Sequence, residues 1–299
     1  MIERRPASPW VLEQLESKFV RLRQGSLEYV LARLEQPRSR TSSRSVPWGL
    51  ADTGRIVGWT IALSAGAICG FFLFRLLLSF AFLFGEGLRI IPVGSYDRLG
   101  TVIAPYGSAI MALCVGGAVC SSLLYAVYRH TVVRYHVPLS SLGFRRLSAR
   151  AYVRIALLFV PVALAGFLLT RLQALIIGGA IHNPQVGILT QGMSASSANF
   201  VMLSILLIVL SPLAEETFFR GFLLTMLRQR MPSWAAISVS AAAFAALHGV
   251  PVLFPWLFFM GVVFGVVVEK TGSIYSSMLL HAMANTIATL SIVVAVSGW

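Results

Sequence analysis

From residue 51 onward the chain alternates long apolar stretches with short polar or basic segments. Each apolar stretch is close to or longer than the roughly 20 residues that a helix needs to cross the hydrocarbon core of a bilayer. The pattern therefore predicts an all-α, polytopic transmembrane helix bundle with about seven to eight spans. We place seven of them at 56–84, 101–127, 152–179, 197–229, 234–250, 253–269 and 273–296.

The first 50 residues follow a different pattern. Residues 10–36 carry apolar side chains at helical spacing, so we expect an amphipathic cytoplasmic helical segment, lying on the membrane surface or packed as a solvated helix pair. Residues 37–48 are polar and basic, which predicts a linker without a core. The expected organisation is a cytoplasmic segment over 1–50, N-terminal transmembrane helices over 51–137 and a C-terminal helical core over 138–299.

Composition and charge agree with a membrane protein. Hydrophobic residues make up 57% of the chain and charged residues 12%, against about 25% charged residues in a soluble domain. The formal charge of +13 is concentrated beside apolar spans, with ten Lys and Arg in residues 1–55 and six in residues 129–154. Such clusters are typical of cytoplasmic loops that face anionic lipid. We expect a multi-pass protein of a bacterial plasma membrane, with its N-terminus in the cytoplasm and no nucleic-acid partner.

Two adjacent glutamates stand out in this apolar background. After Asp97 the acidic residues are Glu215, Glu216 and Glu269. The first two lie within an apolar span, where an ionisable group costs about 2.5–3.5 kcal/mol on insertion scales. Groups of this kind persist where partners or a polar cavity stabilise them, and they mark function by default. Glu269 is most simply a solvated loop charge.

Other polar residues interrupt two later apolar spans, namely His248, and His281 with Asn285. At a rise of 1.5 Å per residue, Glu215 and these three residues all lie roughly 15–22 Å from predicted cytoplasmic loops. Three separate helices would therefore bring polar groups to a similar depth. Taken singly, each histidine or asparagine could instead be a packing or interhelical hydrogen-bonding group.

The spacing of the acidic pair predicts a division of roles. Glu216 and Arg220 are four residues apart, so one helix face can hold them as an ion pair. Desolvation and a neighbouring carboxylate both strengthen proton binding by a carboxylate. We therefore expect Glu216 to be a structural partner of Arg220 and Glu215 to be the general base.

The remaining polar residues complete a set for hydrolysis. His248 could hold the same water as Glu215 and shuttle its proton. His281 and Asn285, one helical turn apart, could donate hydrogen bonds to a developing oxyanion. Activated water, proton shuttle and oxyanion donors together suffice to hydrolyse a peptide bond.

Three motifs also carry a resemblance to a known family. They are EETFFR at 215–220, FAALH at 244–248 and HAMAN at 281–285. Their order and spacing resemble those of the CPBP intramembrane proteases, the CAAX-processing and bacteriocin-processing (Abi-type) family that includes the type II CAAX prenyl endopeptidases. The basic segment 138–146 is also similar, so the resemblance covers roughly residues 138–299.

This resemblance implies a helical bundle whose site lies in a membrane cavity open to the cytosolic side. It also implies that Glu215 and His248 activate water while His281 and Asn285 stabilise the transition state. These roles agree with those expected from the residues themselves.

Both metal-dependent and metal-free glutamate mechanisms are proposed for that family. A zinc site would use His248, His281 and Glu215 as three ligands with one open position. The HExxH arrangement is absent, and the apolar sequence neighbours of the histidines offer no carboxylate to orient them. We therefore favour a site without a metal or other cofactor, with zinc as the alternative.

The leading hypothesis is an intramembrane endopeptidase that cuts a protein or peptide, with or without a lipid modification, near the cytosolic membrane face. One alternative is a proton-coupled transporter, which the nearly apolar outer halves of the last spans disfavour. Another is a non-catalytic membrane scaffold or immunity protein on the same fold. The complete motif set disfavours that alternative.

Overall fold

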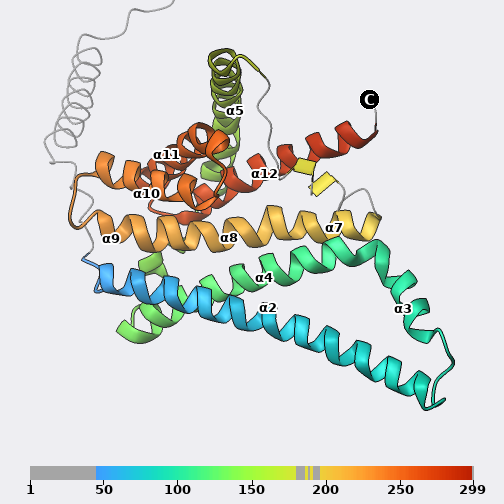
Figure 1. Cartoon of the computed structure of the whole chain (residues 1–299). Helices are drawn as coiled ribbons and strands as arrows, with labels where there is room; N and C mark the ends of the chain where they lie inside the picture. The colour runs from blue at the N-terminus through green and yellow to red at the C-terminus, as the bar shows by residue number, and fades with distance from the viewer. Residues whose placement is uncertain (1–44, 180–185, 188, 191–195, 298–299) are drawn as a thin grey trace, which may run out of the picture. The chain divides into compact units, whose positions relative to one another are not determined.

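The computed structural model describes residues 45–297 apart from 180–185, 188 and 191–195 (Figure 1). The amphipathic segment expected over residues 10–36 lies outside the described residues. Every regular element in the described part of the chain is helical, which confirms the all-α prediction. The α-helices are α2 (Leu50–Gly87), α3 (Ser95–Ile103), α4 (Gly107–Tyr128), α5 (Ala149–Ile177), α7 (Ser197–Ile205), α8 (Ser211–Glu216), α9 (Thr225–Leu227), α10 (Ser233–Leu247), α11 (Phe254–Thr271) and α12 (Ile274–Ser297).

Five helical segments within the described residues are long and apolar enough to cross a membrane, which makes the chain a multi-pass membrane protein. They match the first, second, third, fourth and sixth predicted spans: Leu50–Gly87, Ala109–Val133, Ala149–Ile177, Ser197–Leu227 and Pro251–Thr271. The fifth predicted span, 234–250, coincides with α10, an apolar helix of only 15 residues. The seventh, 273–296, coincides with α12, which has 24 residues and is not among the five.

The paired glutamates lie on one continuous helical path, Ser197–Leu227, which we call the site helix. It alternates α-helical turns with two π-helical segments, η4 (Leu206–Leu210) and η5 (Thr217–Leu224). Wider π-helical turns are frequent at functional sites. Three carbonyls of these segments accept hydrogen bonds from side chains elsewhere: Leu207 from Asn285 (2.7 Å), Phe219 from Ser240 (3.0 Å) and Phe222 from Trp48 (3.3 Å). Three different parts of the chain therefore anchor the site helix.

Helix α4 packs between α2 on one side and the site helix on the other (Figure 1). On the far side of the site helix, α10 and α11 approach each other at two glycines of α11. A Cβ atom on Gly261 would lie 2.8 Å from the Cβ of Ala241, and one on Gly265 would lie 2.9 Å from a methyl carbon of Ile237. Only small residues permit helix backbones to come this close.

The basic segment 138–146 docks against both the site helix and the start of α12. It contains a short 3₁₀ helix, η3 (Leu139–Leu142), whose last carbonyl lies 2.7 Å from the place of a Cβ on Gly221. Gly143 then takes a left-handed conformation (φ +85°), and its carbonyl accepts a hydrogen bond from the Ile274 amide at 3.0 Å. The segment thus fixes the turn before α12 relative to the site helix.

The residues just before α2 correct one expectation. The end of the predicted linker 37–48 is not solvated, because Val46 is 8% exposed and Trp48 only 2% exposed. Trp48 stacks on Phe222 with ring centroids 6.1 Å apart, and Gln229 donates a hydrogen bond to the Val46 carbonyl at 3.1 Å. An apolar tryptophan can bury its large surface there while its N–H finds a carbonyl acceptor.

Glu269 corrects another expectation, since it is not a solvated loop charge. It lies in the last turn of α11, where its Oε1 is 2.7 Å from Nε of Arg228 and its Oε2 accepts a hydrogen bond from Ser233. This ion pair connects Arg228, which directly follows the site helix, to α11 near the predicted cytosolic surface.

Candidate active site

Glu215 stands at the centre of the candidate site, near the end of α8. Its Oε1 accepts a hydrogen bond from the hydroxyl of Ser211, one turn earlier. Its Oε2 lies 3.9 Å from Nε2 of His248 and 3.9 Å from Nε2 of His281. The same Oε2 is buried and has no hydrogen-bond partner among the described residues. Three helices thus bring three of the predicted catalytic side chains together.

Ser211 was not among the site residues predicted from the sequence. Its position four residues before Glu215 could have indicated this contact, because such residues lie on one helix face. The hydroxyl occupies one carboxylate oxygen and leaves the other to face the histidines. This arrangement fixes which oxygen of Glu215 can interact with a substrate or water.

Glu216 and Arg220 form the predicted ion pair. Glu216 is fully buried and Arg220 is 1% exposed, and the two charged groups are 2.9 Å apart. The guanidinium also donates to the Gly261 carbonyl at 3.2 Å and lies over the rings of Phe244 (4.6 Å) and Phe264 (5.0 Å). A buried ion pair is stable only when further hydrogen bonds and favourable contacts satisfy both charges. The α11 backbone and the two rings supply those contacts.

Glu216 has a second role that the sequence did not reveal. The same Oε1 that faces Arg220 lies 3.0 Å from Nδ1 of His281. An ionised carboxylate only accepts hydrogen bonds, so Nδ1 of His281 carries the proton. Nε2 of the same ring is thereby turned toward Glu215. The expectation that no carboxylate orients either histidine is therefore wrong.

His248 directly follows α10, and its ring is held in a similar way. Its Nδ1 is 2.7 Å from the Phe244 carbonyl, which can only accept, so this nitrogen is also protonated. Its Nε2 then faces Glu215. The Phe244 ring lies against both imidazoles, with centroid distances of 4.7 Å to His248 and 5.8 Å to His281. The contact of this ring with both imidazoles explains why an aromatic residue stands one turn before His248.

Asn285 is placed differently from the other predicted residues. Its Nδ2 donates to the Leu207 carbonyl in the π-helical segment η4 at 2.7 Å. No hydrogen bond within the described residues joins it to Glu215 or to either histidine. The structure therefore connects Asn285 to the backbone of the site helix, and one of its two amide hydrogens is used there.

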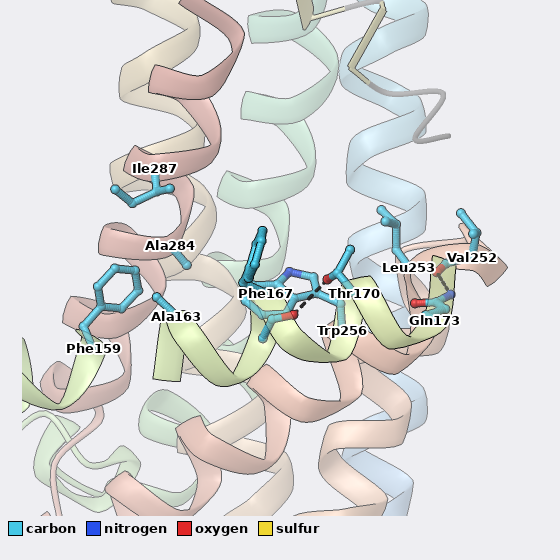
Figure 2. Close-up of a pocket in the computed structure, with 11 residues that line it drawn as sticks. Phe159, Ala163, Phe167, Thr170, Gln173, Val252, Leu253, Trp256, Ala284 and Ile287 are labelled. Carbon is cyan, nitrogen blue, oxygen red and sulfur yellow. Dashed lines mark hydrogen bonds between the residues drawn. The ribbon is translucent and has the colours of Figure 1, made fainter. Parts of the chain in front are cut away.

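An apolar cavity of about 330 Å³ lies beside this part of α12, between α5, α11 and α12 (Figure 2). Figure 2 shows Phe159 at one end and, at the other, Gln173, which donates to the Val252 carbonyl at 2.7 Å. Ala284 lines the cavity three residues after His281, so the cavity borders the neighbouring face of the same helix. Its lining suits an apolar group.

The side chains around Glu215 Oε2 meet the donor requirements of a zinc site but not its spacing. Two imidazole nitrogens and a carboxylate oxygen are suitable donor types, and a carboxylate and a carbonyl hold the opposite nitrogens of the rings as in many zinc sites. The 3.9 Å separations exceed the roughly 3.4 Å between neighbouring ligands of a tetrahedral zinc ion. Across the described ranges, no group of three or more His, Cys, Asp or Glu has a geometry that could hold a metal.

Part of the chain matches a known protein family. Residues 197–287 match the family model described as type II CAAX prenyl endopeptidase Rce1-like, a stretch that contains all six predicted site residues. An uncharacterized 24.3 kDa protein of Escherichia coli is 28% identical over 137 residues, which cover 44% of this chain and 63% of that relative. No solved structure matches the chain. The resemblance seen in the three motifs is thus confirmed, and residues 197–287 form a domain of the Rce1-like type II CAAX prenyl endopeptidase family.

Proposed function

We propose that this chain is an intramembrane endopeptidase in which Glu215 activates a water for attack on a peptide bond, without a metal ion. The observation that carries the proposal is the position of Glu215 Oε2, buried, unpartnered and 3.9 Å from Nε2 of both His248 and His281. These separations are too long for direct hydrogen bonds. A water bound between these groups would contact the carboxylate and an imidazole at once. Membership of the protease family supports the reaction class.

The first step forms a bond between the water oxygen and the carbonyl carbon of the substrate. As that bond forms, Glu215 takes a proton from the water as general base. His248 accepts a second hydrogen bond from the same water through the lone pair on its Nε2. In the second step the C–N bond breaks, and the proton held by Glu215 passes to the amine nitrogen, directly or through His248. The products are a carboxylic acid and an amine, and Glu215 returns to its starting state.

His281 supplies the oxyanion donor in this scheme when it is doubly protonated. The two carboxylates of Glu215 and Glu216 are then balanced by the guanidinium of Arg220 and the imidazolium of His281, so the buried cluster has no net charge. Contact between Glu216 and Nδ1 orients the ring so that its Nε2 points toward Glu215. A preorganised donor of this kind is the most effective way to stabilise developing negative charge.

Asn285 contributes its second amide hydrogen to the same oxyanion, while the first holds the Leu207 carbonyl. Glu216 and Arg220 act as positioning residues because they do not touch the reacting atoms. Together these roles account for all six predicted site residues.

We also propose how the protein is oriented in the membrane. Helices α10 and α12 also lie in the bilayer, which gives seven crossings with the N-terminus in the cytoplasm. The basic segments 1–55 and 129–154 then both face anionic lipid on the cytoplasmic side of a bacterial plasma membrane. Cleavage takes place near that side, on a protein or peptide substrate. An apolar or lipid group on the substrate fits the cavity beside α12.

The test compares membranes that contain the wild-type protein with membranes that contain Glu215→Gln, using proteomics to find an uncleaved precursor. Gln keeps the size of the side chain and removes the base, so we expect the precursor to accumulate while the protein stays folded and inserted. Glu269→Gln is a matched control because Glu269 pairs with Arg228 away from the site. Full processing in the Glu215→Gln membranes would rule out Glu215 as the base.

A further inference from the structure

A second cavity, of about 680 Å³, lies between α2, α3 and α4. None of the six predicted site residues lines it. Its walls are largely apolar, with Phe71, Phe74 and Leu78 from α2 and with Ile110 and Met111 from α4. Two residues of opposite charge share this cavity, Arg75 from α2 and Asp97 from α3.

These two charges have no partner in the described part of the protein. Neither residue takes part in any of its ion pairs, and the guanidinium of Arg75 makes no hydrogen bond there. Arg75 also separates two uncharged, apolar runs of α2, residues 56–74 and 76–85. An arginine in such a setting is costly unless an anionic group accompanies it.

The other polar groups around the cavity are already engaged. The hydroxyls of Ser79 and Tyr96 bond to each other at 2.8 Å, and the Tyr96 amide donates to Glu86 at 2.8 Å. Arg98, next to Asp97 in the chain, donates to the Ser95 hydroxyl and does not line the cavity. Arg75 and Asp97 therefore remain as one cationic and one anionic contact for a ligand with an apolar body.

We propose that this cavity binds a zwitterionic phospholipid with a primary ammonium head group, that is, phosphatidylethanolamine. The phosphate pairs with Arg75, whose planar guanidinium is well suited to phosphate oxygens. The ammonium donates hydrogen bonds to Asp97, and an acyl chain lies along the aromatic and aliphatic walls. A purely anionic head group would leave Asp97 facing like charge. A choline head group has no N–H to offer the carboxylate.

Two glycines show that the cavity can be filled without disturbing its surroundings. A Cβ atom on Gly100 or on Gly107 would meet nothing within 4 Å, and both residues line the cavity. A larger side chain at Gly100, in the middle of α3, should also favour the helix. Gly100→Leu therefore blocks the site while leaving both charged residues in place.

The experiment titrates the full-length protein in detergent with phosphatidylethanolamine, phosphatidylcholine and phosphatidylglycerol of identical acyl chains, and counts bound lipid by native mass spectrometry. We expect phosphatidylethanolamine to bind most tightly. Arg75→Gln and Asp97→Asn should each weaken its binding by about tenfold. Asp97→Asn should also remove the preference over phosphatidylglycerol. Arg98→Gln, the matched control, should bind like the wild type.

Gly100→Leu should abolish this binding while the protein remains monodisperse. Equal affinity of the wild type for phosphatidylglycerol and phosphatidylethanolamine would overturn the proposal. So would wild-type binding by Gly100→Leu, or equal effects of Arg75→Gln and Arg98→Gln. The readout is lipid binding and needs no proteolysis, so the result is independent of the proposed enzymatic function.

Discussion

Glu216 and His281, 65 residues apart in the chain, meet through a carboxylate oxygen and Nδ1 at a distance of 3.0 Å. The same oxygen is 2.9 Å from Nη1 of Arg220. One fully buried carboxylate therefore orients an imidazole of the candidate site and neutralises an arginine. The second glutamate of the EExxxR motif thus connects the stability of the bundle with the geometry of its chemistry.

Neutralising Glu216 should destabilise the protein strongly. Glu216→Gln leaves Arg220 buried without a counter-charge, which typically costs about 3–5 kcal/mol of unfolding free energy. The double variant Glu216→Gln with Arg220→Met removes both charges and should be less destabilised than the sum of the single changes, by about 1–3 kcal/mol. Unfolding by SDS in mixed micelles measures the stability of Glu216→Gln, of Arg220→Met and of the double variant. Simple additivity would mean that the two residues are not coupled.

Replacing Asn285 separates a structural role from a catalytic one. Asn285→Ala leaves the Leu207 carbonyl without its donor, at a cost of about 1–3 kcal/mol. It should also lower kcat by about 10²–10³ with little change in KM if an amide hydrogen reaches the oxyanion. Ser240→Ala removes a comparable anchor at Phe219 and serves as the control. Equal kcat values per folded molecule in the two variants would limit Asn285 to the structural role.

The close approach of α10 and α11 should make Gly261 intolerant of even one methyl group. Gly261→Ala places a Cβ within 2.9 Å of both Cα and Cβ of Ala241, so the helices must separate. Overpacking of this kind costs about 1–3 kcal/mol, and it also shifts the carbonyl that holds Arg220. Gly70→Ala on α2, where a Cβ meets nothing within 4 Å, should be neutral or slightly stabilising. Thermal stability measured in detergent for both variants checks this difference.

Trp48 should matter to stability far more than its place in the sequence indicates. Trp48→Phe keeps the stacking on Phe222 but removes the side-chain donor to the Phe222 carbonyl, which still accepts from the Thr225 amide, so it should cost about 0.5–1.5 kcal/mol. Trp48→Ala also opens a cavity and should cost about 3–5 kcal/mol. Trp234→Phe, at a position 73% exposed, is the control and should change little. A Trp48→Ala variant as stable as the control would show that this contact contributes nothing.

Removal of metal ions should leave proteolysis intact. The spacing around Glu215 is wider than that of tetrahedral zinc ligands. Purified protein freed of metal by chelation and verified by elemental analysis should therefore cleave at an unchanged rate. Loss of activity that zinc alone restores would establish the alternative set of Glu215, His248 and His281 as ligands.

Much of this arrangement follows from sequence periodicity. Runs of apolar residues predicted the helices, and the i,i+4 spacing predicted the ion pair of Glu216 with Arg220. The similar depth of Glu215, His248 and His281 predicted that three helices would bring them together, as the 3.9 Å separations bear out. These features depend on residue spacing, which can be counted in the sequence, and on the rise per residue, which is the same in every α-helix.

Contacts between distant segments could not be predicted in the same way. Nothing in the chain near His281 indicates that Glu216 holds its Nδ1, because that contact depends on how two helices rotate against each other. The π-helical turns of the site helix leave no periodic signature. Trp48 stands at the end of a polar, basic stretch, and only the tertiary structure shows that its ring is buried.

The anchoring of the site helix by Trp48, Ser240 and Asn285 bears on any attempt to transplant the candidate site into another protein. Two of these anchors lie within residues 197–287, whereas Trp48 comes from the opposite end of the chain. A version of the chain cut to residues 197–287 would lose the tryptophan that contacts the site helix. Miniaturised or chimeric versions must therefore carry a surrogate for residues 46–48.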